Sequence, residues 1–290
     1  MTPRAATLIG LSAILMWSLL SVLTVATGRI PAFQLLAMTF AIGAIAASVG
    51  WIGRPDAIRA LQQPLLAWAV GVGGLFGYHA LYFVALRLAP PAEAGLLNYL
   101  WPLLIVLLSS LLPGERLARH HIIGAVLGLA GTVLLLAGNQ STRFEPAHGV
   151  GFVAAFVAAF VWAGYSVMSR KLKAVPTDAV AGFCLTTALL ALLVHLAFEV
   201  TVWPDGLRQW LAIAALGVGP VGAAFYAWDI GMKRGDIRVL GAASYATPLL
   251  STGFLILAGY ASPSANLAIA AALIAGGGLI AAKDMILKRG

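Results

Sequence analysis

Charged residues are scarce in this chain, and their scarcity excludes most functional classes at once. Only 10% of the 290 residues are charged and 61% are hydrophobic, whereas a soluble domain usually carries about 25% charged residues. A water-soluble fold would have nowhere to bury so much apolar surface. The apolar stretches are about twenty residues long and continuous rather than alternating, so the sequence predicts an all-α protein embedded in a bilayer.

Cysteine and the sequence motifs of metal or nucleotide chemistry are nearly absent. Cys184 is the single cysteine, which excludes an internal disulfide and leaves no cysteine-based metal site. The chain has no HExxH sequence of a zinc hydrolase and no GxxxxGK[ST] loop for ATP. We therefore expect no cofactor, no metal and no enzymatic activity, with an intramembrane enzyme as the alternative from another class.

The net charge of +8 would suggest a nucleic-acid partner in a soluble protein. Here the basic residues lie in short loops between the apolar stretches, so we expect no nucleic-acid partner. The expected partners are membrane lipid, a small-molecule substrate and, through helices rich in small residues, a second copy of the chain as a homodimer.

Ten apolar stretches, mostly separated by proline or glycine, predict ten transmembrane helices. The first is too long for the core of a cleaved signal peptide, so we expect it to be retained. The expected spans are Ala5–Ala26, Phe33–Ile52, Leu65–Leu86, Glu93–Leu112, His121–Ala137, His148–Ser169, Asp178–Phe198, Gln209–Met232, Leu240–Ala258 and Ala265–Ala282.

The distribution of Lys and Arg predicts the orientation of these spans. With the N-terminus in the cytoplasm, fourteen of the eighteen basic residues fall in inner segments. The four in outer loops are Arg29, Arg87, Arg143 and Arg208. Cytoplasmic segments of membrane proteins carry this excess of positive charge, so we predict that both termini are cytoplasmic.

The chain matches itself at about half its length. The segment GLLNYLWPLL at Gly95–Leu104 shares five of ten residues with GAASYATPLL at Gly241–Leu250, at an offset of 146. At an offset of 145, Trp17 matches Trp162. Trp, Tyr and Pro are rarer than Leu or Ala in apolar segments, so these matches indicate an internal repeat.

The repeat predicts two halves of five helices each, residues 1–145 and 146–290. Because five is odd, the second half enters the membrane from the opposite side and is inverted. Inverted repeats place a solute site near the midplane of the bilayer and are typical of secondary transporters.

Further stretches extend this pattern over the whole chain. Helices four and nine share G-x3-Y-x2-P, and the most informative segments are ATLIGLSAILMWS (Ala5–Ser18), NYLWPLL (Asn98–Leu104), FVWAGYSV (Phe160–Val167) and AASYATPLLS (Ala242–Ser251). With these features the chain resembles the drug/metabolite transporter superfamily of the EamA type, and within it the bacterial aromatic amino acid exporters of the YddG type. The resemblance implies a central cavity, export of aromatic amino acids, and action without ATP or a cofactor. Asp229 departs from the pattern, because a neutral amide is expected after Trp228.

Polar aromatic residues gather inside six of the ten spans, and a buried Tyr hydroxyl or Trp N–H needs a partner that lipid cannot supply. We therefore expect a shared cavity near the midplane, with helix packing through Tyr and Ser as the alternative. The predicted substrate-binding residues are Trp17, Tyr78, His79, Tyr82, Asn98, Tyr99, Trp101, Trp162, Tyr165, Ser244 and Tyr245.

Two prolines lie in the middle of spans, Pro102 in helix four and Pro248 in helix nine. Proline cannot donate a backbone hydrogen bond, so each interrupts its helix and frees the carbonyl one turn earlier, at Asn98 and Ser244. Such carbonyls could hold the amine of a substrate, or the prolines could serve as packing kinks.

Ionisable groups within spans are few, and we consider three of them for proton coupling. His79 lies between two tyrosines in helix three and can titrate near neutral pH. Glu93 begins helix four, where a carboxylate also complements the helix dipole. Asp229 precedes Lys233 by four residues, the spacing of an ordinary helical ion pair.

Together these features predict a secondary transporter of a bacterial inner membrane that works by alternating access. The resemblance implies that it exports amino acids, aromatic ones in particular. The alternative within the same class is an exporter of another small solute or of a cationic drug. A cation exporter should offer a carboxylate that faces the cavity, and only Glu93 and Asp229 could serve. A cavity rich in Trp, Tyr and Ser suits a flat, amphipathic, net-neutral solute better.

Overall fold

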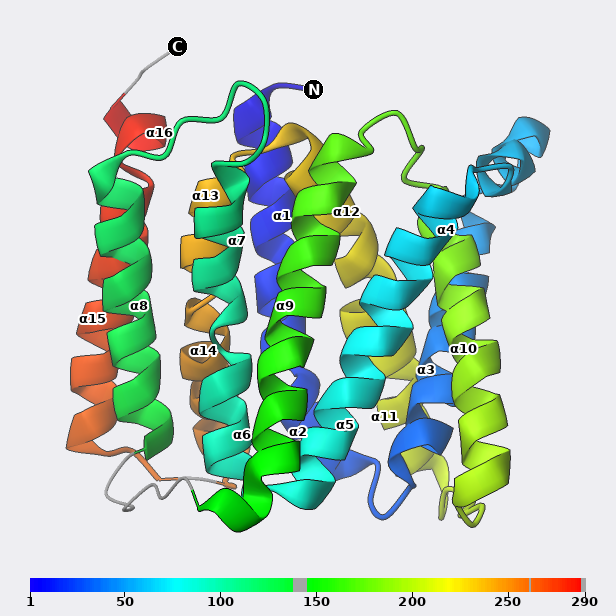
Figure 1. Ribbon diagram of the computed structural model, residues 1–290. Coiled ribbons are helices and arrows are strands. Elements are labelled where there is room, and N and C mark those ends of the chain that lie inside the picture. Colours follow the sequence, from blue (N-terminus) through cyan, green and yellow to red (C-terminus); the bar gives the residue numbers. More distant parts are fainter. Residues whose placement is uncertain (138–144, 261, 288–290) are drawn as a thin grey trace.

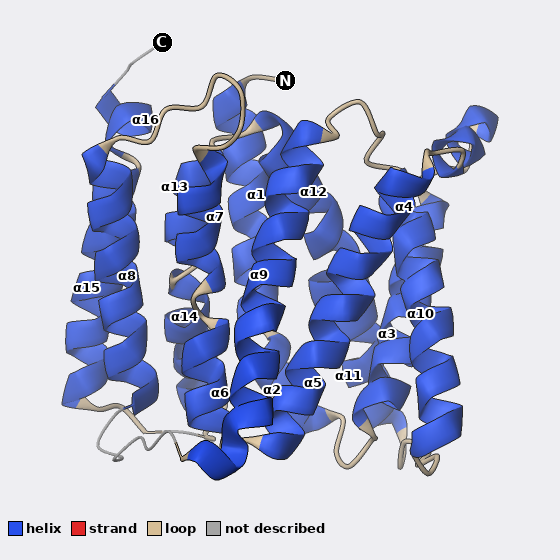
Figure 2. Cartoon of the chain, in the orientation of Figure 1, coloured by secondary structure: helices blue, strands red, loops and turns tan. Residues whose placement is uncertain are grey.

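The computed structural model describes residues 1–137, 145–260 and 262–287, and this part of the chain contains helices, turns and loops but no strand (Figures 1 and 2). Arg143, Lys288 and Arg289, which contribute to the predicted charge bias, lie outside the described residues. The first half contains α1 (Pro3–Ser18), α2 (Leu20–Ala26), α3 (Ala32–Val49), α4 (Leu65–Val72), α5 (Tyr78–Leu88), α6 (Pro91–Asn98), α7 (Trp101–Ser109) and α8 (Arg119–Ala137). The second half contains α9 (Gly149–Lys171), α10 (Ala179–Phe198), α11 (Leu207–Leu216), α12 (Ala224–Arg234), α13 (Ile237–Ala243), α14 (Ala246–Leu257), α15 (Ala265–Ala281) and α16 (Lys283–Leu287).

These elements combine into ten apolar helical spans. In the described part of the chain, nine helical stretches are long and apolar enough to cross a membrane. The tenth span, α15, is shorter, with 17 residues, but it is apolar and lies beside α8 at one edge of the bundle (Figure 1). The predicted all-α architecture of ten membrane helices is thereby confirmed.

The chain begins and ends on one side of the bundle. The start of α1 and the short helix α16 lie at the same end, which we refer to as the terminal side (Figure 1). The long helix α9 starts at the opposite side and ends at the terminal side, so it runs antiparallel to α1, its predicted counterpart. This direction agrees with an inverted repeat, while the division at residue 145 stays a prediction.

Spans four and nine are interrupted at equivalent places. Helix α6 ends at Asn98 and α7 begins at Trp101, whereas α13 ends at Ala243 and α14 begins at Ala246. Pro102 and Pro248 each lie just inside the following segment, where the missing N–H breaks the hydrogen-bond ladder. Both interruptions therefore lie directly before the prolines that the sequence singles out.

Of the two roles considered for Pro248, the structure agrees with the packing kink, because the Ser244 carbonyl already has a partner. The Thr247 N–H donates to that carbonyl oxygen at 3.0 Å. A tighter i→i+3 turn has thus satisfied the orphan acceptor, as often happens at helix ends.

Spans three and eight share a second irregularity that sequence patterns did not predict. Each contains a π-helical turn, Gly73–Gly77 before α5 and Gly217–Ala223 before α12. The helices that follow have 11 residues each, and they begin at Tyr78 and Ala224, which are 146 positions apart. This is the same offset as the sequence match between spans four and nine, so the backbone carries the repeat as well.

Helices without tyrosine flank the centre of the bundle. The pairs α8 with α15 and α3 with α10 make extensive contacts along their lengths, and Figure 1 shows the first pair at one edge. A Cβ atom built on Gly124 would lie only 2.4 Å from the Gly277 carbonyl oxygen, so glycine permits this close approach. The remaining spans enclose the centre, where the interruptions meet.

Candidate functional site

A cavity of about 240 Å³ lies at the level of the helix interruptions. It extends from this level along α2, the first turns of α5 and the first turns of α14, all of which run toward the side opposite the termini (Figure 1). The lining residues are Trp17, Leu20, Ser21, Tyr78, His79, Tyr82, Asn98, Tyr99, Trp101, Trp162, Phe225, Thr247 and Ser251.

The cavity brings together eight of the eleven predicted substrate-binding residues. These are Trp17, Tyr78, His79, Tyr82, Asn98, Tyr99, Trp101 and Trp162. Their assignment to one cavity is a finding of the structure, and their contact with a solute stays a prediction.

Three predicted residues do not line this cavity, and the expectation that they face it is corrected. Tyr165 is 4% exposed and packs against Gly74, whose Cβ would lie 2.4 Å from its ring. Tyr245 is fully buried and accepts a hydrogen bond from the Leu103 N–H at 3.1 Å. Ser244 is also fully buried, and its hydroxyl donates to the Leu240 carbonyl at 2.7 Å.

Five lining residues were missing from the predicted set. Ser21 lies four residues after Trp17, and Ser251 lies four residues after Thr247. Residues at this spacing share one face of a helix, so the predicted Trp17 offered a signal for Ser21, whereas Thr247 and Ser251 had no predicted residue at this spacing. Leu20 and Phe225 carry no polar group, and their inward position depends on the break at Leu19 and on the π-helical turn before α12.

Indole rings form the floor of the cavity. The Trp17 ring meets the Trp162 ring edge to face, with centroids 5.5 Å apart, and lies 5.0 Å from Trp228. Trp101 also meets Trp162 edge to face at 6.2 Å. Edge-to-face and offset contacts are the favoured geometries of aromatic pairs. Because Trp228 is fully buried, it seals the floor toward the terminal side.

Two polar atoms of cavity-lining residues have no protein partner among the described residues. The Asn98 amide donates from Nδ2 to the Tyr78 hydroxyl at 3.1 Å, but its Oδ1 accepts no hydrogen bond. The Thr247 hydroxyl is likewise buried without a partner. Buried polar groups usually find partners, so both atoms keep hydrogen-bonding capacity that a polar solute can use only after neighbouring side chains move.

His79 presents one ring nitrogen to its own helix. Its Nδ1 lies 2.6 Å from the Leu75 carbonyl oxygen. A carbonyl can only accept, so the proton lies on Nδ1 and the neutral ring offers Nε2 as an acceptor. Of the three residues considered for proton coupling, only His79 lines the cavity.

The two acidic residues considered for coupling lie elsewhere. Asp229 is buried and paired with Lys233, whose Nζ lies 2.8 Å from its Oδ2, and the Thr177 hydroxyl donates to the same oxygen at 2.7 Å. This agrees with the interpretation of Asp229 as a structural ion pair. Glu93 is buried in the first turn of α6, also outside the cavity. No acidic side chain is among the cavity-lining residues that the structure describes.

Charged side chains close the terminal side of the bundle. Glu115, in the loop between α7 and α8, accepts a hydrogen bond from Arg170 of α9 and lies 3.5 Å from Arg238 of α13. Arg170 also donates to the Met232 and Gly235 carbonyl oxygens at 3.2 and 2.6 Å. Both contacts of Glu115 cross from the first half of the chain to the second, so they hold the two halves together at this end.

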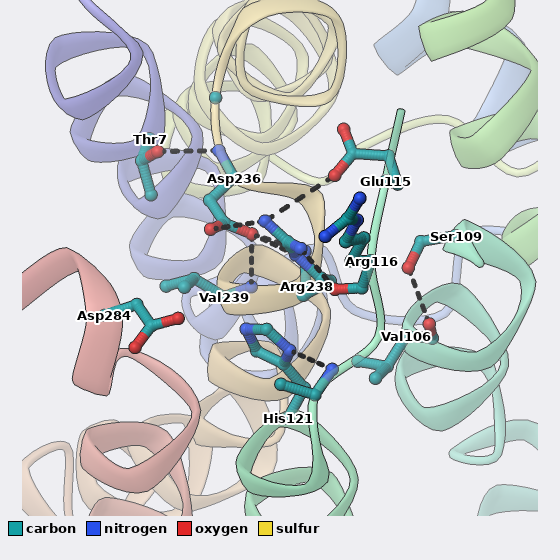
Figure 3. Close-up of polar contacts among 12 residues, drawn as sticks. Thr7, Val106, Ser109, Glu115, Arg116, His121, Asp236, Arg238, Val239 and Asp284 are labelled. Atoms are coloured by element: carbon teal, nitrogen blue, oxygen red, sulfur yellow. Dashed lines mark hydrogen bonds and ion pairs between the residues drawn. The ribbon is translucent and has the colours of Figure 1, made fainter. Parts of the chain in front are cut away.

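Asp236 continues this network at the start of α13. Its carboxylate accepts a hydrogen bond from the Arg238 Nε at 3.0 Å, and its N–H donates to the Thr7 hydroxyl at 2.9 Å. Figure 3 shows both contacts. The Arg238 Nη1 in turn donates to the Arg116 carbonyl at 2.7 Å. Burial by itself would raise the pKa of Asp236, but the hydrogen bonds and charge of Arg238 outweigh burial and hold that pKa below its usual value.

The arrangement can bind a flat solute that carries one apolar ring and one polar end. The rings of the floor offer stacking surfaces, while Asn98, Tyr78 and His79 offer hydrogen bonds. In the described part of the chain, no cluster of His, Cys, Asp and Glu side chains could hold a metal ion.

Known proteins are similar to this chain in sequence and in structure. The model of the EamA-like transporter family matches residues 4–137 and again residues 149–283. The aromatic amino acid exporter YddG of Ancylobacter novellus is 55% identical over 282 residues, which cover 97% of this chain and 98% of that protein. The exporter of the same name from Salmonella typhimurium is 29% identical over 89% of each chain. A crystal structure of a protein 55% identical superposes with a TM-score of 0.93 over 97% of both chains.

Proposed function

Because this chain belongs to the EamA-like transporter family, we propose that it is a secondary transporter that exports aromatic amino acids across the cytoplasmic membrane of a bacterium. The substrate class is the one named for the relatives from Ancylobacter novellus, Salmonella typhimurium and Escherichia coli. The chain moves its solute without altering it chemically.

The observation that carries the proposal is the chemistry of the cavity wall. Seven of the thirteen lining residues are Trp, Tyr or Phe, and none is Asp, Glu, Lys or Arg. Aromatic walls gain most from an aromatic solute, since stacked or edge-to-face rings contribute about 0.5–1.5 kcal/mol beyond the burial of area. A wall without charge suits a zwitterion, whose net charge is zero.

The volume of the cavity points the same way. At about 240 Å³ it falls just below the range of about 300–1,000 Å³ that is usual for drug-sized ligands. A single amino acid is therefore a better fit than a larger drug.

Export by alternating access requires the cavity to open to each side in turn. In this structure the cavity faces the side opposite the termini, and Trp228 and the Glu115 ion pairs close the terminal side. With the terminal side assigned to the cytoplasm, as the basic residues favour, this is the state from which an exporter releases its solute.

A cationic drug is the alternative substrate, and the cavity offers it little. A cation brings a net charge that needs a carboxylate nearby in a low-dielectric site, whereas a zwitterion carries its own carboxylate. Asp229 is already neutralised by Lys233, and Glu93 does not line the cavity. The proposal therefore places a zwitterion, not a cation, in the cavity.

Counterflow in proteoliposomes that contain the full chain tests this function. Vesicles preloaded with unlabelled phenylalanine, tyrosine or tryptophan should accumulate external labelled phenylalanine, and vesicles preloaded with leucine should not. Protein-free vesicles are the control. Equal accumulation with leucine, or none with any aromatic amino acid, contradicts the proposal, and stronger exchange with phenethylamine than with phenylalanine supports the cationic alternative instead.

A further inference from the structure

The three predicted site residues that lie outside the cavity occupy positions equivalent to residues near or inside it. The repeat aligns span one with span six at an offset of 145, as Trp17 and Trp162 show. On that alignment Tyr165 corresponds to Leu20, which lines the cavity. At the offset of 146 for spans four and nine, Ser244 corresponds to Asn98 and Tyr245 to Tyr99, which also line it.

The same alignment divides all thirteen lining residues into two groups. Six of them form three pairs of equivalent residues, in which both members line the cavity. These six therefore lie at the centre of the molecule, where the two halves meet. These are the pairs Trp17 with Trp162, His79 with Phe225, and Trp101 with Thr247. The other seven correspond to residues on the terminal side of the floor, which are Tyr165, Ser166, Ala224, Trp228, Ser244, Tyr245 and Ile105.

Each member of this second group is buried in the present structure. Tyr165 is 4% exposed and the other six are 0% exposed. Such complete burial is what an inverted repeat predicts for the counterparts of an open cavity, because opening one side closes the equivalent surfaces on the other.

The geometry points to a second solute-binding wall. We propose that Tyr165, Ser166, Trp228, Ser244 and Tyr245 contact the aromatic solute when the cavity faces the terminal side, while the six central residues contact it in both states. This inference rests on the proposed function, because it uses the same solute and the same cavity.

The chemistry of the second wall matches that of the first. It offers two phenol rings, one indole ring and two hydroxyls, and no charge. Its polar atoms are satisfied inside the protein for now, since the Trp228 Nε1 donates to the Ser166 Oγ at 3.1 Å and the Ser244 hydroxyl donates to a carbonyl of its own helix. Opening of the terminal side would release these groups to a solute.

The two walls differ at the positions that hold the polar end of a solute. Tyr78 and Asn98, which share a hydrogen bond in the open wall, correspond to Ala224 and Ser244. The second wall can therefore stack on a ring but offers fewer hydrogen bonds to an amino-acid backbone. A solute should be held more weakly on the terminal side than on the opposite side.

The ion pairs of Glu115 keep the second wall closed. They join the loop after α7 to α9 and α13 across the two halves, and the side chain of Glu115 is only 12% exposed. Movement of α9 and α13 away from α7 would break both contacts. Glu115→Gln removes the charge but keeps the shape, so it should raise the population of the state in which the second wall is open.

Thiol labelling from either side of the membrane tests the second wall. The single native cysteine, Cys184, is buried in α10 outside both walls, so the unchanged protein should stay unlabelled and Cys184→Ser provides the background. Two single cysteines are introduced into this background, Ser166→Cys and its counterpart Ser21→Cys. Each is made with and without Glu115→Gln. An impermeant maleimide is applied to oriented vesicles from one side at a time.

Ser21→Cys should react from the side opposite the termini, and Ser166→Cys only from the terminal side. Glu115→Gln should raise the rate at Ser166→Cys by roughly 2- to 30-fold, as expected for the loss of two ion pairs. Phenylalanine should slow that reaction, and leucine should not. If Ser166→Cys disturbs folding, Ser244→Cys serves as the second reporter.

Labelling of Ser166→Cys from the opposite side overturns the inference. So does labelling from neither side with Glu115→Gln present, provided that Ser21→Cys reacts in the same protein. Reaction from the terminal side without protection by phenylalanine overturns the assignment of the wall to the solute. Counterflow by the unchanged protein tests the proposed function separately. A failure of the second wall can therefore be distinguished from a failure of the proposed function.

Discussion

At the scale of single residues, the indole rings of the cavity floor should govern affinity for the solute. Trp101 and Trp162 meet edge to face, and neither indole N–H donates to another described residue. Replacing either by alanine removes one ring contact, worth about 0.5–1.5 kcal/mol. The half-saturating concentration of phenylalanine in counterflow should therefore rise roughly 2- to 13-fold.

Trp203→Ala is the matched control for these variants, because this tryptophan is 67% exposed and lies outside the cavity. It should leave the half-saturating concentration unchanged. If Trp101→Ala and Trp162→Ala also behave like the unchanged protein at equal amounts of reconstituted protein, the rings do not contact the solute.

Asn98 should hold the amino group of the solute. Its Oδ1 has no partner in the protein, while its Nδ2 is fixed by the Tyr78 hydroxyl. A hydrogen bond to a charged group contributes about 1.5–3 kcal/mol, so Asn98→Leu should weaken competition by phenylalanine roughly 10- to 160-fold. Competition by 3-phenylpropionate, which lacks the amine, should change far less. Equal losses for the two competitors would show that Asn98 acts on packing and not on the amine.

At the scale of helices, the α8–α15 contact should govern stability and leave selectivity unchanged. A Cβ on Gly277 would lie 2.5 Å from the Gly124 carbonyl oxygen, whereas a Cβ on Gly276 meets nothing within 4 Å. Gly277→Ala should lower the free energy of unfolding by about 1–3 kcal/mol through overpacking, and Gly276→Ala should not lower it. Denaturation of the purified protein in detergent measures both. Equal stability of the two variants, or altered selectivity in a folded Gly277→Ala protein, would contradict this role.

Helix interruptions show what the sequence could and could not predict about elements. Pro102 and Pro248 revealed the breaks in spans four and nine, because a missing N–H has a direct local effect. The π-helical turn Gly73–Gly77 contains no proline and depends on packing against other spans, so no local pattern revealed it. The inward position of Phe225 follows from the second such turn, Gly217–Ala223, which contains Pro220, so a local signal was present there and was missed.

At the scale of the whole molecule, the fold was predictable and the conformational state was not. Continuous apolar stretches and the internal match predicted ten helices with a central aromatic cavity. A repeat, however, describes both states of a transporter equally well. The prediction placed Tyr165, Ser244 and Tyr245 in the cavity, and the structure shows them buried outside it, at the positions of the proposed second wall.

The orientation of the molecule is open to a direct test. We predict that the terminal side is cytoplasmic, so Arg116→Cys in the Cys184→Ser background should react with an impermeant maleimide only after cells are permeabilised. Arg116 is exposed in the loop between α7 and α8, so access is not limited by burial. Arg208→Cys, at the opposite end, is the matched control and should react in intact cells. Reaction of Arg116→Cys in intact cells would reverse the assignment of sides.

Photocrosslinking with 4-azidophenylalanine would locate the solute in the protein. If the aromatic cavity is the transport site, adducts in the reconstituted full chain should map to peptides that contain Tyr78, Tyr99, Trp101 or Trp162. Excess phenylalanine should reduce these adducts, and excess leucine should not. Adducts confined to the outer helices α3, α8, α10 or α15, or adducts that excess phenylalanine leaves unchanged, would contradict a transport site in the aromatic cavity.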